Sequence, residues 1–338
     1  MTDTSDGPKI GISISDFDDS TLRRVRQLGI TTVHSSGGIP SPNTNFGLEK
    51  HLPWTEKTLG SDLKALDAHG MRMGAKMITG FPNAIYGRPG RDKEIEAVIQ
   101  SVKVAALLEM PVIEYNWYAH RATEGYYLVE GRGGSRYRAF DYQIVKGLPA
   151  LPDEGAHTAD EMWDNITYFL EAVIPIASEK GVRFALHPND PPAPISRGSE
   201  QIMGSVAGWK NLVSIVDSTS NGITFDCGGT RELGEDPVDT ARYFGELDRI
   251  NHVHWRNVIT EIPRQKYTEV FLDEGQVDMQ GVMEELVRQG YPRMVYPEHP
   301  PIIDHDEEFK PKQSGEGYAG LAYTVGYARA SLKAALRA

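Results

Sequence analysis

The 338-residue sequence predicts an α/β protein built as a single (β/α)8 TIM barrel. Short apolar or β-branched runs, typical of strands, alternate eight times with longer segments of helical spacing, as in a parallel sheet covered by helices. Eight such units close into a barrel. No segment resembles a linker, so we expect one domain over residues 1–338. An open doubly wound sheet is the alternative. No Gly-x-Gly-x-x-Gly pattern follows the first strand, so nothing supports dinucleotide binding.

The eight predicted strands are short, and the first alternates with the period of two that a strand requires. In chain order they cover residues 9–14, 30–35, 72–78, 112–116, 182–186, 222–226, 250–255 and 293–296.

Cap signals mark several of the predicted helices. Asp18 or Asp19 can cap the first, and Thr55 can cap the second. Asp236 followed by Pro237 has the pattern of a capping residue and an N1 proline. The longer helices are expected over residues 20–28, 92–109, 159–180, 205–216, 278–288 and 317–337.

The stretch after the fourth strand, residues 117–158, is far longer than an ordinary connection between a strand and a helix. It is rich in tyrosine and arginine, and aromatic residues and arginine favour interfaces. One interpretation is an inserted lid or arm over the site, or an oligomer contact, and the other is an ordinary excursion packed on its own barrel. The sequence leaves both open, and with them a homo-oligomer of two or more subunits.

Composition and charge exclude several classes of partner. The formal net charge of −12 argues against nucleic acid or an anionic membrane surface. No apolar run approaches the roughly 20 residues that span a bilayer, and residues 1–8 are too polar and acidic for a targeting peptide. The single cysteine excludes an internal disulfide framework and indicates a reducing compartment. We therefore expect a cytoplasmic protein whose partner is a small molecule.

Metal-ligating side chains stand at the ends of the fifth to eighth predicted strands. They are His187, Asp226, His254 and Glu298. Chemistry in such barrels lies at this rim, and neighbouring strands are about 4.8 Å apart, so the four side chains can converge on one ion. A single strand histidine is more often structural, as we interpret His34 and His252. Two imidazoles and two carboxylates at equivalent places predict a divalent metal site suited to Mn²⁺, Fe²⁺, Co²⁺ or Zn²⁺.

Several neighbouring residues have more than one interpretation. Cys227 competes with the preceding aspartate as third ligand, although a buried inert thiol is its simpler interpretation. Glu114 is a candidate fifth or substitute ligand, and Asn116 suits a substrate hydroxyl. His299 is suited to proton transfer near neutral pH, or is merely a loop histidine. Arg256 can clamp a carboxylate, or form a surface salt bridge.

The motifs around these residues resemble the mannonate dehydratase family of metal-dependent barrel lyases. The order of the family's motifs is kept from about residue 160 to the end, with thinner matches at residues 39–40 and 115–116. The matching stretches are His187-Pro188-Asn189-Asp190-Pro191-Pro192, Asn221-Gly222-Ile223-Thr224-Phe225, His254-Trp255-Arg256-Asn257-Val258, Asp278-Met279, Pro297-Glu298-His299 and Gly317-Tyr318-Ala319-Gly320.

The resemblance implies a ligand set. His187 and His254 match two metal ligands of the family. Asp226 falls on the third, a cysteine in the family, and Glu298 replaces the fourth, an aspartate. Exchanging a thiolate for a carboxylate moves the preference of the site toward Mn²⁺ or Mg²⁺.

The resemblance also bears on catalysis and substrate. His299 and Tyr318 match positions that the family uses for acid/base work. The family has a His-His pair where this chain has Gly37-Gly38, and a Thr-Gly-Ser that is altered here to Cys227-Gly228-Gly229. These departures touch the substrate side of the site. The substrate-binding candidates are Arg256, Asn257, Asn116 and Asp190.

These observations predict a hydro-lyase that dehydrates a mannonate-type sugar acid to a 2-keto-3-deoxy acid. Mn²⁺ is the expected cofactor, with Mg²⁺, Fe²⁺ and Co²⁺ open. The alternative is a metal-dependent sugar isomerase or epimerase, because many barrels with a His/Asp/Glu metal set move a proton between adjacent carbons. A third possibility is a non-catalytic sugar-binding or assembly protein that kept the barrel.

Overall fold

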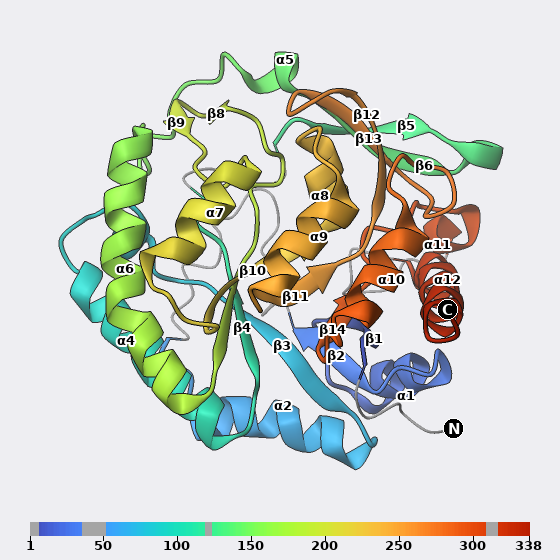
Figure 1. Cartoon of the computed structure of the whole chain (residues 1–338), viewed down its shortest axis with the longest axis horizontal. Coiled ribbons are helices and arrows are strands. Elements are labelled where there is room, and N and C mark those ends of the chain that lie inside the picture. The colour runs from blue at the N-terminus through green and yellow to red at the C-terminus, as the bar shows by residue number, and fades with distance from the viewer. Residues whose placement is uncertain (1–6, 36–51, 119–123, 309–316) are drawn as a thin grey trace.

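Eight parallel strands form a closed barrel in the order β1-β14-β11-β10-β7-β4-β3-β2, which confirms the predicted fold class (Figure 1). The computed structural model describes residues 7–35, 52–118, 124–308 and 317–338. The barrel strands are β1 (Lys9–Ile14), β2 (Thr32–Ser35), β3 (Arg72–Ile78), β4 (Val112–Tyr115), β7 (Arg183–Leu186), β10 (Asn221–Asp226), β11 (Ile250–His254) and β14 (Met294–Tyr296). Each lies within two residues of its predicted bounds.

One long helix follows each barrel strand and lies outside it (Figure 1). These helices are α1 (Asp19–Gln27), α2 (Glu56–Ala68), α4 (Arg91–Leu107), α6 (Ala159–Lys180), α7 (Val206–Ile215), α9 (Pro237–Glu246), α10 (Met279–Arg288) and α12 (Tyr318–Ala335). The predicted caps are present: Asp18 accepts from Thr21 N–H, Thr55 from Thr58 N–H, and Asp236 from two backbone N–H groups. The shorter helices are α3 (Pro82–Ile85), α5 (Tyr142–Val145), α8 (Cys227–Glu232), α11 (Asp304–Glu308) and the 3₁₀ turn η1 (Arg132–Gly134).

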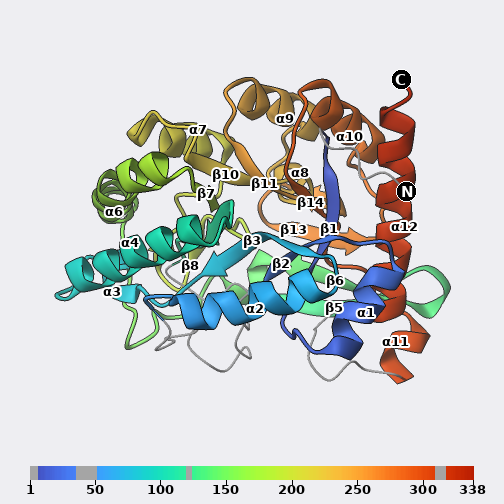
Figure 2. The same ribbon diagram turned by 90° about the horizontal axis from the view of Figure 1, so that it is seen from below.

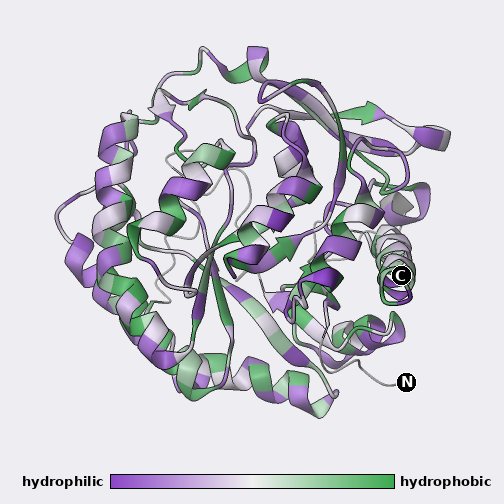
Figure 3. Ribbon diagram, in the orientation of Figure 1, coloured by the Kyte–Doolittle hydropathy of each residue, from purple (hydrophilic) through white to green (hydrophobic). Residues whose placement is uncertain are grey.

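The main hydrophobic core lies between the strands and the helices. The outer helices carry alternating hydrophobic and hydrophilic stripes (Figure 3). On α6 the residues Met162, Ile166, Phe169 and Val173 recur at helical spacing and are buried. Burying each such side chain contributes about 1.5–3 kcal/mol relative to leaving it exposed. The barrel is therefore held from outside, which leaves its interior free to hold polar groups.

A second sheet lies beside the barrel, and none of its strands was predicted, although two of them come from the predicted insertion. Its strand order is β12-β13-β6-β5, all antiparallel neighbours. The hairpin β5 (Tyr126–Glu130) and β6 (Arg136–Asp141) comes from the insertion after the fourth barrel strand. The hairpin β12 (Asn257–Ile262) and β13 (Lys266–Val270) follows β11 and was not predicted. Figure 2 shows β13, β6 and β5 together. A minor pair, β8 (Ile195–Ser196) and β9 (Ser199–Glu200), completes the strands.

The barrel interior near the strand ends is polar and layered. Side chains two residues apart on a strand share a face. Thr224 on β10 and His252 on β11 therefore point inward one layer below Asp226 and His254. Both members of the lower pair are buried, at 0% and 1% exposure. The strand register thus stacks a layer of metal-ligating side chains on a layer of buried polar ones.

No helix in the described ranges is both long and apolar enough to cross a membrane. This agrees with the absence of a long apolar run in the sequence.

Candidate metal centre

Four donor side chains meet at the carboxyl ends of four neighbouring barrel strands. Asp226 and His254 are the last residues of β10 and β11, while His187 directly follows β7 and Glu298 lies just beyond β14. One ligand atom from each lies within 4.8 Å of the others. All four side chains are buried. The structure therefore brings together all four residues that the sequence analysis predicted as metal ligands.

The two histidines face each other through one nitrogen each. His187 Nε2 lies 3.1 Å from His254 Nδ1, and that same Nδ1 lies 3.0 Å from Glu298 Oε2. The other nitrogen of His187, Nδ1, lies 2.7 Å from the carbonyl oxygen of Pro188, to which an N–H at this position donates. This contact fixes the tautomer whose Nε2 lone pair points into the centre.

The donor set fits a divalent cation. Glu298 Oε1 is buried and accepts no hydrogen bond in the described structure, so it has capacity for a further electropositive partner. Burial disfavours a charged His254, yet Glu298 and Glu114 outweigh burial and raise the pKa of His254 well above its usual value. A site that draws positive charge onto a histidine is electrostatically suited to a cation, and mixed imidazole and carboxylate donors suit Mn²⁺, Fe²⁺ or Co²⁺.

Arg256 lies inside this acidic site instead of at the surface. Only 1% of its side chain is exposed. Its Nη2 donates to Asp226 Oδ2 at 2.7 Å, and its Nε lies 3.3 Å from Glu298 Oε1. Asp226 Oδ1 accepts the Gly229 N–H of α8 at 2.8 Å. Oδ2 of Asp226 also accepts from Arg256 Nε at 3.0 Å, so Arg256 and Gly229 orient both oxygens, and Oδ1 keeps a lone pair that a metal could use.

Arg256 has further carboxylate partners that the sequence analysis missed. Glu232 pairs with its Nη1, and Glu269 lies 3.5 Å from the same nitrogen. Burial of Glu232 raises the pKa of its carboxyl well above the usual value, opposed by Arg256. A Cβ on Gly228 would stand 2.6 Å from Arg256 Cγ, so glycine is required there for the guanidinium to enter. Arg256 is saturated with protein carboxylates, which disfavours its predicted use as a clamp for the substrate.

His299 reaches the site through an unusual backbone conformation. Neighbouring residues in an extended strand point to opposite sides, so Glu298 and His299 would normally diverge. His299 has φ +51°, in the left-handed region that few residues other than glycine adopt, with asparagine, aspartate and histidine the most frequent among them. Its Nδ1 lies 3.2 Å from Glu269 Oε2, and its Nε2 lies 3.5 Å from Glu298 Oε2. This backbone conformation therefore returns the ring to the candidate metal centre, beside Glu298.

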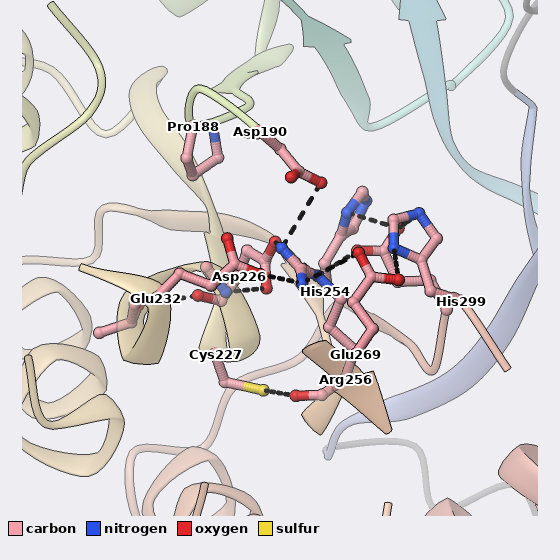
Figure 4. Close-up of polar contacts among 12 residues, drawn as sticks. Pro188, Asp190, Asp226, Cys227, Glu232, His254, Arg256, Glu269 and His299 are labelled. Carbon is pink, nitrogen blue, oxygen red and sulfur yellow. Dashed lines mark hydrogen bonds and ion pairs between the residues drawn. The ribbon is translucent and has the colours of Figure 1, made fainter. Parts of the chain in front are cut away.

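Asp190 lies on the other side of Arg256, as Figure 4 shows, at 3.5 Å from its Nη2. Tyr126 from the insertion donates to Asp190 Oδ1, and the Tyr267 hydroxyl of β13 lies 3.4 Å from the same oxygen. Burial opposes ionisation of Asp190, but Arg256, His299 and Arg138 lower its pKa to about 2. The second sheet thus forms one wall of the site.

Cys227 points away from the donors. Its sulfur donates to the backbone carbonyl of Arg256 at 3.3 Å, on the side opposite the donor atoms (Figure 4). Burial raises the pKa of this thiol. The inert interpretation of Cys227 therefore fits its contacts, and the competition with Asp226 is resolved by the strand alternation.

Three other candidates lie in different surroundings. The Tyr318 hydroxyl donates to the backbone carbonyl of Arg24 on α1 at 3.3 Å, which places it on the outer layer and not among the donor atoms. The Asn257 amide donates to the carbonyls of Leu272 and Val277, and its side-chain oxygen accepts from backbone N–H groups. These contacts hold the backbone together. Asn116 directs its amide to Met77 Sδ, and its oxygen is buried without a hydrogen bond. The structure does not bring Tyr318 or Asn257 to the donor atoms.

Some of the sequence-level observations fall outside the described residues. They are the Gly37-Gly38 departure, the match at residues 39–40, and the part of the insertion at residues 119–123.

The fold and the donor set together define a TIM-barrel protein with a candidate metal centre at its strand ends. The family model of D-mannonate dehydratase matches residues 155–337, which is more than half of the chain. The chain belongs to the mannonate dehydratase family. Membership implies a hydro-lyase, a carbon–oxygen lyase that eliminates water, and it confirms the resemblance read from the motifs.

Individual relatives agree with this assignment. The chain is 34% identical over 212 residues to a mannonate dehydratase of Enterococcus faecalis (strain ATCC 700802 / V583), covering 61% of this chain and 56% of that protein. It is 28% identical over 304 residues to one of Streptococcus agalactiae serotype V, covering 80% and 86% of the two chains.

Solved structures show the same fold. The mannonate dehydratase from Streptococcus suis serotype2 superposes with a TM-score of 0.82 at 22% identity, covering 98% of this chain and 95% of that one. An L-ribulose 3-epimerase superposes with a TM-score of 0.59 at 14% identity, covering 98% and 96%. The barrel is thus shared by enzymes of both kinds of chemistry that the sequence left open.

Proposed function

We propose that the protein dehydrates a mannonate-type sugar acid to a 2-keto-3-deoxy acid at a divalent metal centre. The reaction removes the hydrogen α to the carboxylate and the hydroxyl on the next carbon as one water, and the resulting enol becomes the 2-keto product. The observation that carries the proposal is the convergence of four buried donors, His187, Asp226, His254 and Glu298, in a chain of this family.

The four donors would hold the ion, which when bound supplies a Lewis acid for the substrate's oxygens. Burial of the site excludes bulk water, so its charges interact more strongly than they would in solvent. With two carboxylates and no thiolate among its ligands, the centre is proposed to prefer Mn²⁺.

His299 is the proposed proton-transfer residue. Its ring lies between Glu298 and Glu269, so Glu269 can orient it and balance its charge when it carries a proton. Tyr318 stays a prediction based on the family motif alone, and it requires a movement of the start of α12 to reach the donors.

Substrate contacts are proposed for Asp190 and Asn116. Asp190 is ionised and partnered by tyrosines, so it suits the hydroxyl groups of a sugar acid. Asn116 has a buried oxygen free to accept from a hydroxyl. Arg256 is proposed to hold Asp226 and Glu298 in place. We do not assign it a direct contact with the substrate carboxylate, because its guanidinium is already paired with protein carboxylates.

Product analysis tests the function. The Mn²⁺-loaded enzyme is incubated with mannonate and with other aldonic acids, and the product mass is measured. We expect the mass to fall by one water with at least one of them, and a 2-keto acid to be detected. An unchanged mass with a rearranged sugar would instead identify the isomerase or epimerase.

Three further properties are proposed from the sequence and are independent of the chemistry. A reducing, cytoplasmic compartment follows from the single, buried cysteine. A homo-oligomer follows from the tyrosine- and arginine-rich insertion, residues 117–158. No nucleic-acid partner is expected at a net charge of −12.

A further inference from the structure

A buried carboxylate lies directly beneath the metal donors and is not one of them. Glu114 is on β4 and is 0% exposed. Its Oε1 lies 3.2 Å from His254 Nε2, and its Oε2 lies 2.9 Å from His34 Nε2. Thr224 donates its hydroxyl to Oε1 at 2.7 Å. Burying a carboxylate is costly unless its partners compensate, so this arrangement needs a reason.

The reason follows from the two nitrogens of His254. Nδ1 faces the donors, at 3.1 Å from His187 Nε2 and 3.0 Å from Glu298 Oε2. Nε2 faces Glu114. A neutral imidazole carries one proton, and the nitrogen that lacks it is the one that can bind a metal. A carboxylate at Nε2 holds the proton there and leaves the Nδ1 lone pair directed at the ion.

We propose that Glu114 is a positioning residue of the metal centre, which fixes the tautomer and ring orientation of His254. The inference rests on the proposed function in that it requires the four donors to bind a metal. Thr224 and His34 fix Glu114 in turn, and Ser13 Oγ lies 2.9 Å from His34 Nδ1, so the chain of contacts continues into the barrel. His187 has its own counterpart in the Pro188 carbonyl, so both imidazoles are oriented from outside the donor set.

The alternative is that Glu114 itself binds a second ion with His34 and His252, because ligand atoms of these three also lie within 4.8 Å of one another. Two observations disfavour it. Both oxygens of Glu114 already face partners, and Nδ1 of His34 is taken by Ser13. The rings of His34 and His252 are stacked at 5.5 Å with 18° between their planes, so the rings lie face to face instead of converging edge-on on one point.

Mn²⁺ titration calorimetry of the metal-stripped protein tests the proposal with a readout independent of activity. Glu114→Ala removes both the charge and the acceptor, and Glu114→Gln keeps an acceptor for His254 but removes the charge. The matched control is Asp306→Asn, another buried carboxylate, which accepts the Ala319 and Gly320 N–H groups at the start of α12. Unfolding of each stripped variant is measured in parallel, because a purely structural role would lower stability without changing metal affinity.

Wild-type protein is expected to bind one Mn²⁺ per chain. Glu114→Ala should weaken binding by roughly 10–100-fold, Glu114→Gln by less, and the control not at all. The visible spectrum of the Co²⁺-loaded enzyme should change in the two Glu114 variants, since His254 is then oriented differently.

Two results would overturn the inference while leaving the metal centre intact. One is a Glu114→Ala protein that binds one Mn²⁺ as tightly as wild type. The other is a wild-type protein that binds two ions and loses one on Glu114→Ala, since Glu114 would then be a direct ligand. Absence of Mn²⁺ binding by the wild-type protein would instead overturn the proposed metal centre itself.

Discussion

At the scale of single residues, the site is a cluster of buried carboxylates paired with the buried guanidinium of Arg256. Asp226 and Glu298 are at once donors of the metal centre and partners of the guanidinium. This double contact explains why Arg256 is buried, because its guanidinium offsets the repulsion between the two carboxylates. The arginine therefore stabilises the arrangement of these side chains at the candidate metal centre.

A prediction at this scale concerns the pH dependence of stability. The pKa of Asp190 is lowered from 3.8 to about 2 in the folded protein. A depressed folded-state pKa contributes stability that is present above 3.8 and is lost as the pH falls toward 2, a contribution of about 2 kcal/mol. Asp190→Asn should therefore be less stable than wild type at pH 6 by about that amount.

Urea denaturation of both proteins between pH 6 and pH 3 measures this difference. The gap between their unfolding free energies should narrow below pH 4, because Asp190 then becomes protonated in the unfolded chain. A gap that is constant over this range would show that the carboxylate is not stabilised by Arg256 and its neighbours.

The limits of sequence reasoning are also visible at this scale. The alternation of side chains along a strand left Asp226 and Cys227 as rivals for the third ligand, and the family resemblance assigned that position to Asp226. Alternation could not predict the position of His299, because it places this ring opposite Glu298, and only the positive φ brings it back. Glu232 and Glu269 were missed because their relation to Arg256 depends on contacts between segments that the sequence does not pair. The one signal in the sequence was the arginine directly after the seventh predicted strand, because a charge buried at a strand end requires carboxylate partners.

At the scale of elements, the four-stranded sheet is what distinguishes this barrel from a plain one. The insertion hairpin pairs with β13, and the two hairpins together bring Tyr126 and Tyr267 to Asp190, and Glu269 to His299. The described part of the insertion therefore lies beside the site. Its roles as a lid or arm and as an oligomer contact stay predictions.

A matched pair of tyrosine variants tests this role of the sheet. Tyr267 and Tyr291 are both buried, and each uses its hydroxyl, Tyr267 toward Tyr126 and Asp190, and Tyr291 on the carbonyl of Met294. Removing either hydroxyl should cost about 1 kcal/mol of stability. Only Tyr267→Phe should also lower kcat/KM, by roughly tenfold or more, because Asp190 loses a partner.

Melting temperatures and steady-state kinetics of the two variants are compared side by side. Equal kinetic effects in Tyr267→Phe and Tyr291→Phe would mean that the sheet supports the barrel generally and has no part in the site.

The hairpin β12–β13 shows why the sheet was not foreseen. The segment has β-branched residues at alternate positions of β12, an aromatic residue in β13 and a proline at the turn. They are Val258, Thr260, Ile262, Tyr267 and Pro263. The pattern is that of a hairpin. The segment was assigned as a βα connection between the seventh strand and the next helix, because eight strands elsewhere already completed the predicted barrel. The strand–helix units of the barrel were predictable, because hydrophobic periodicity marks their strands and helices and capping residues mark the starts of several helices.

At the scale of the whole molecule, closure of the barrel is what assembles the site. The four donors are far apart in the sequence, between residues 187 and 298, and share no local motif. Parallel pairing of β7, β10, β11 and β14 places their carboxyl ends on one rim. The layer below has Thr224 on β10, Glu114 on the neighbouring side of the barrel on β4, and His34 on β2, and it supports the four side chains from inside the barrel.

The mannonate dehydratase and L-ribulose 3-epimerase structures both have this barrel fold, so the fold alone does not decide the reaction. The family model and the strand-end motifs decide it, and the metal centre is the feature on which the whole account depends.

Anomalous diffraction from crystals grown with Mn²⁺ tests this centre most directly. The account predicts one peak among His187, Asp226, His254 and Glu298, and its loss in Asp226→Ala crystals grown in the same way. A map with no peak at these four residues, or with its only peak among His34, Glu114 and His252, would contradict it.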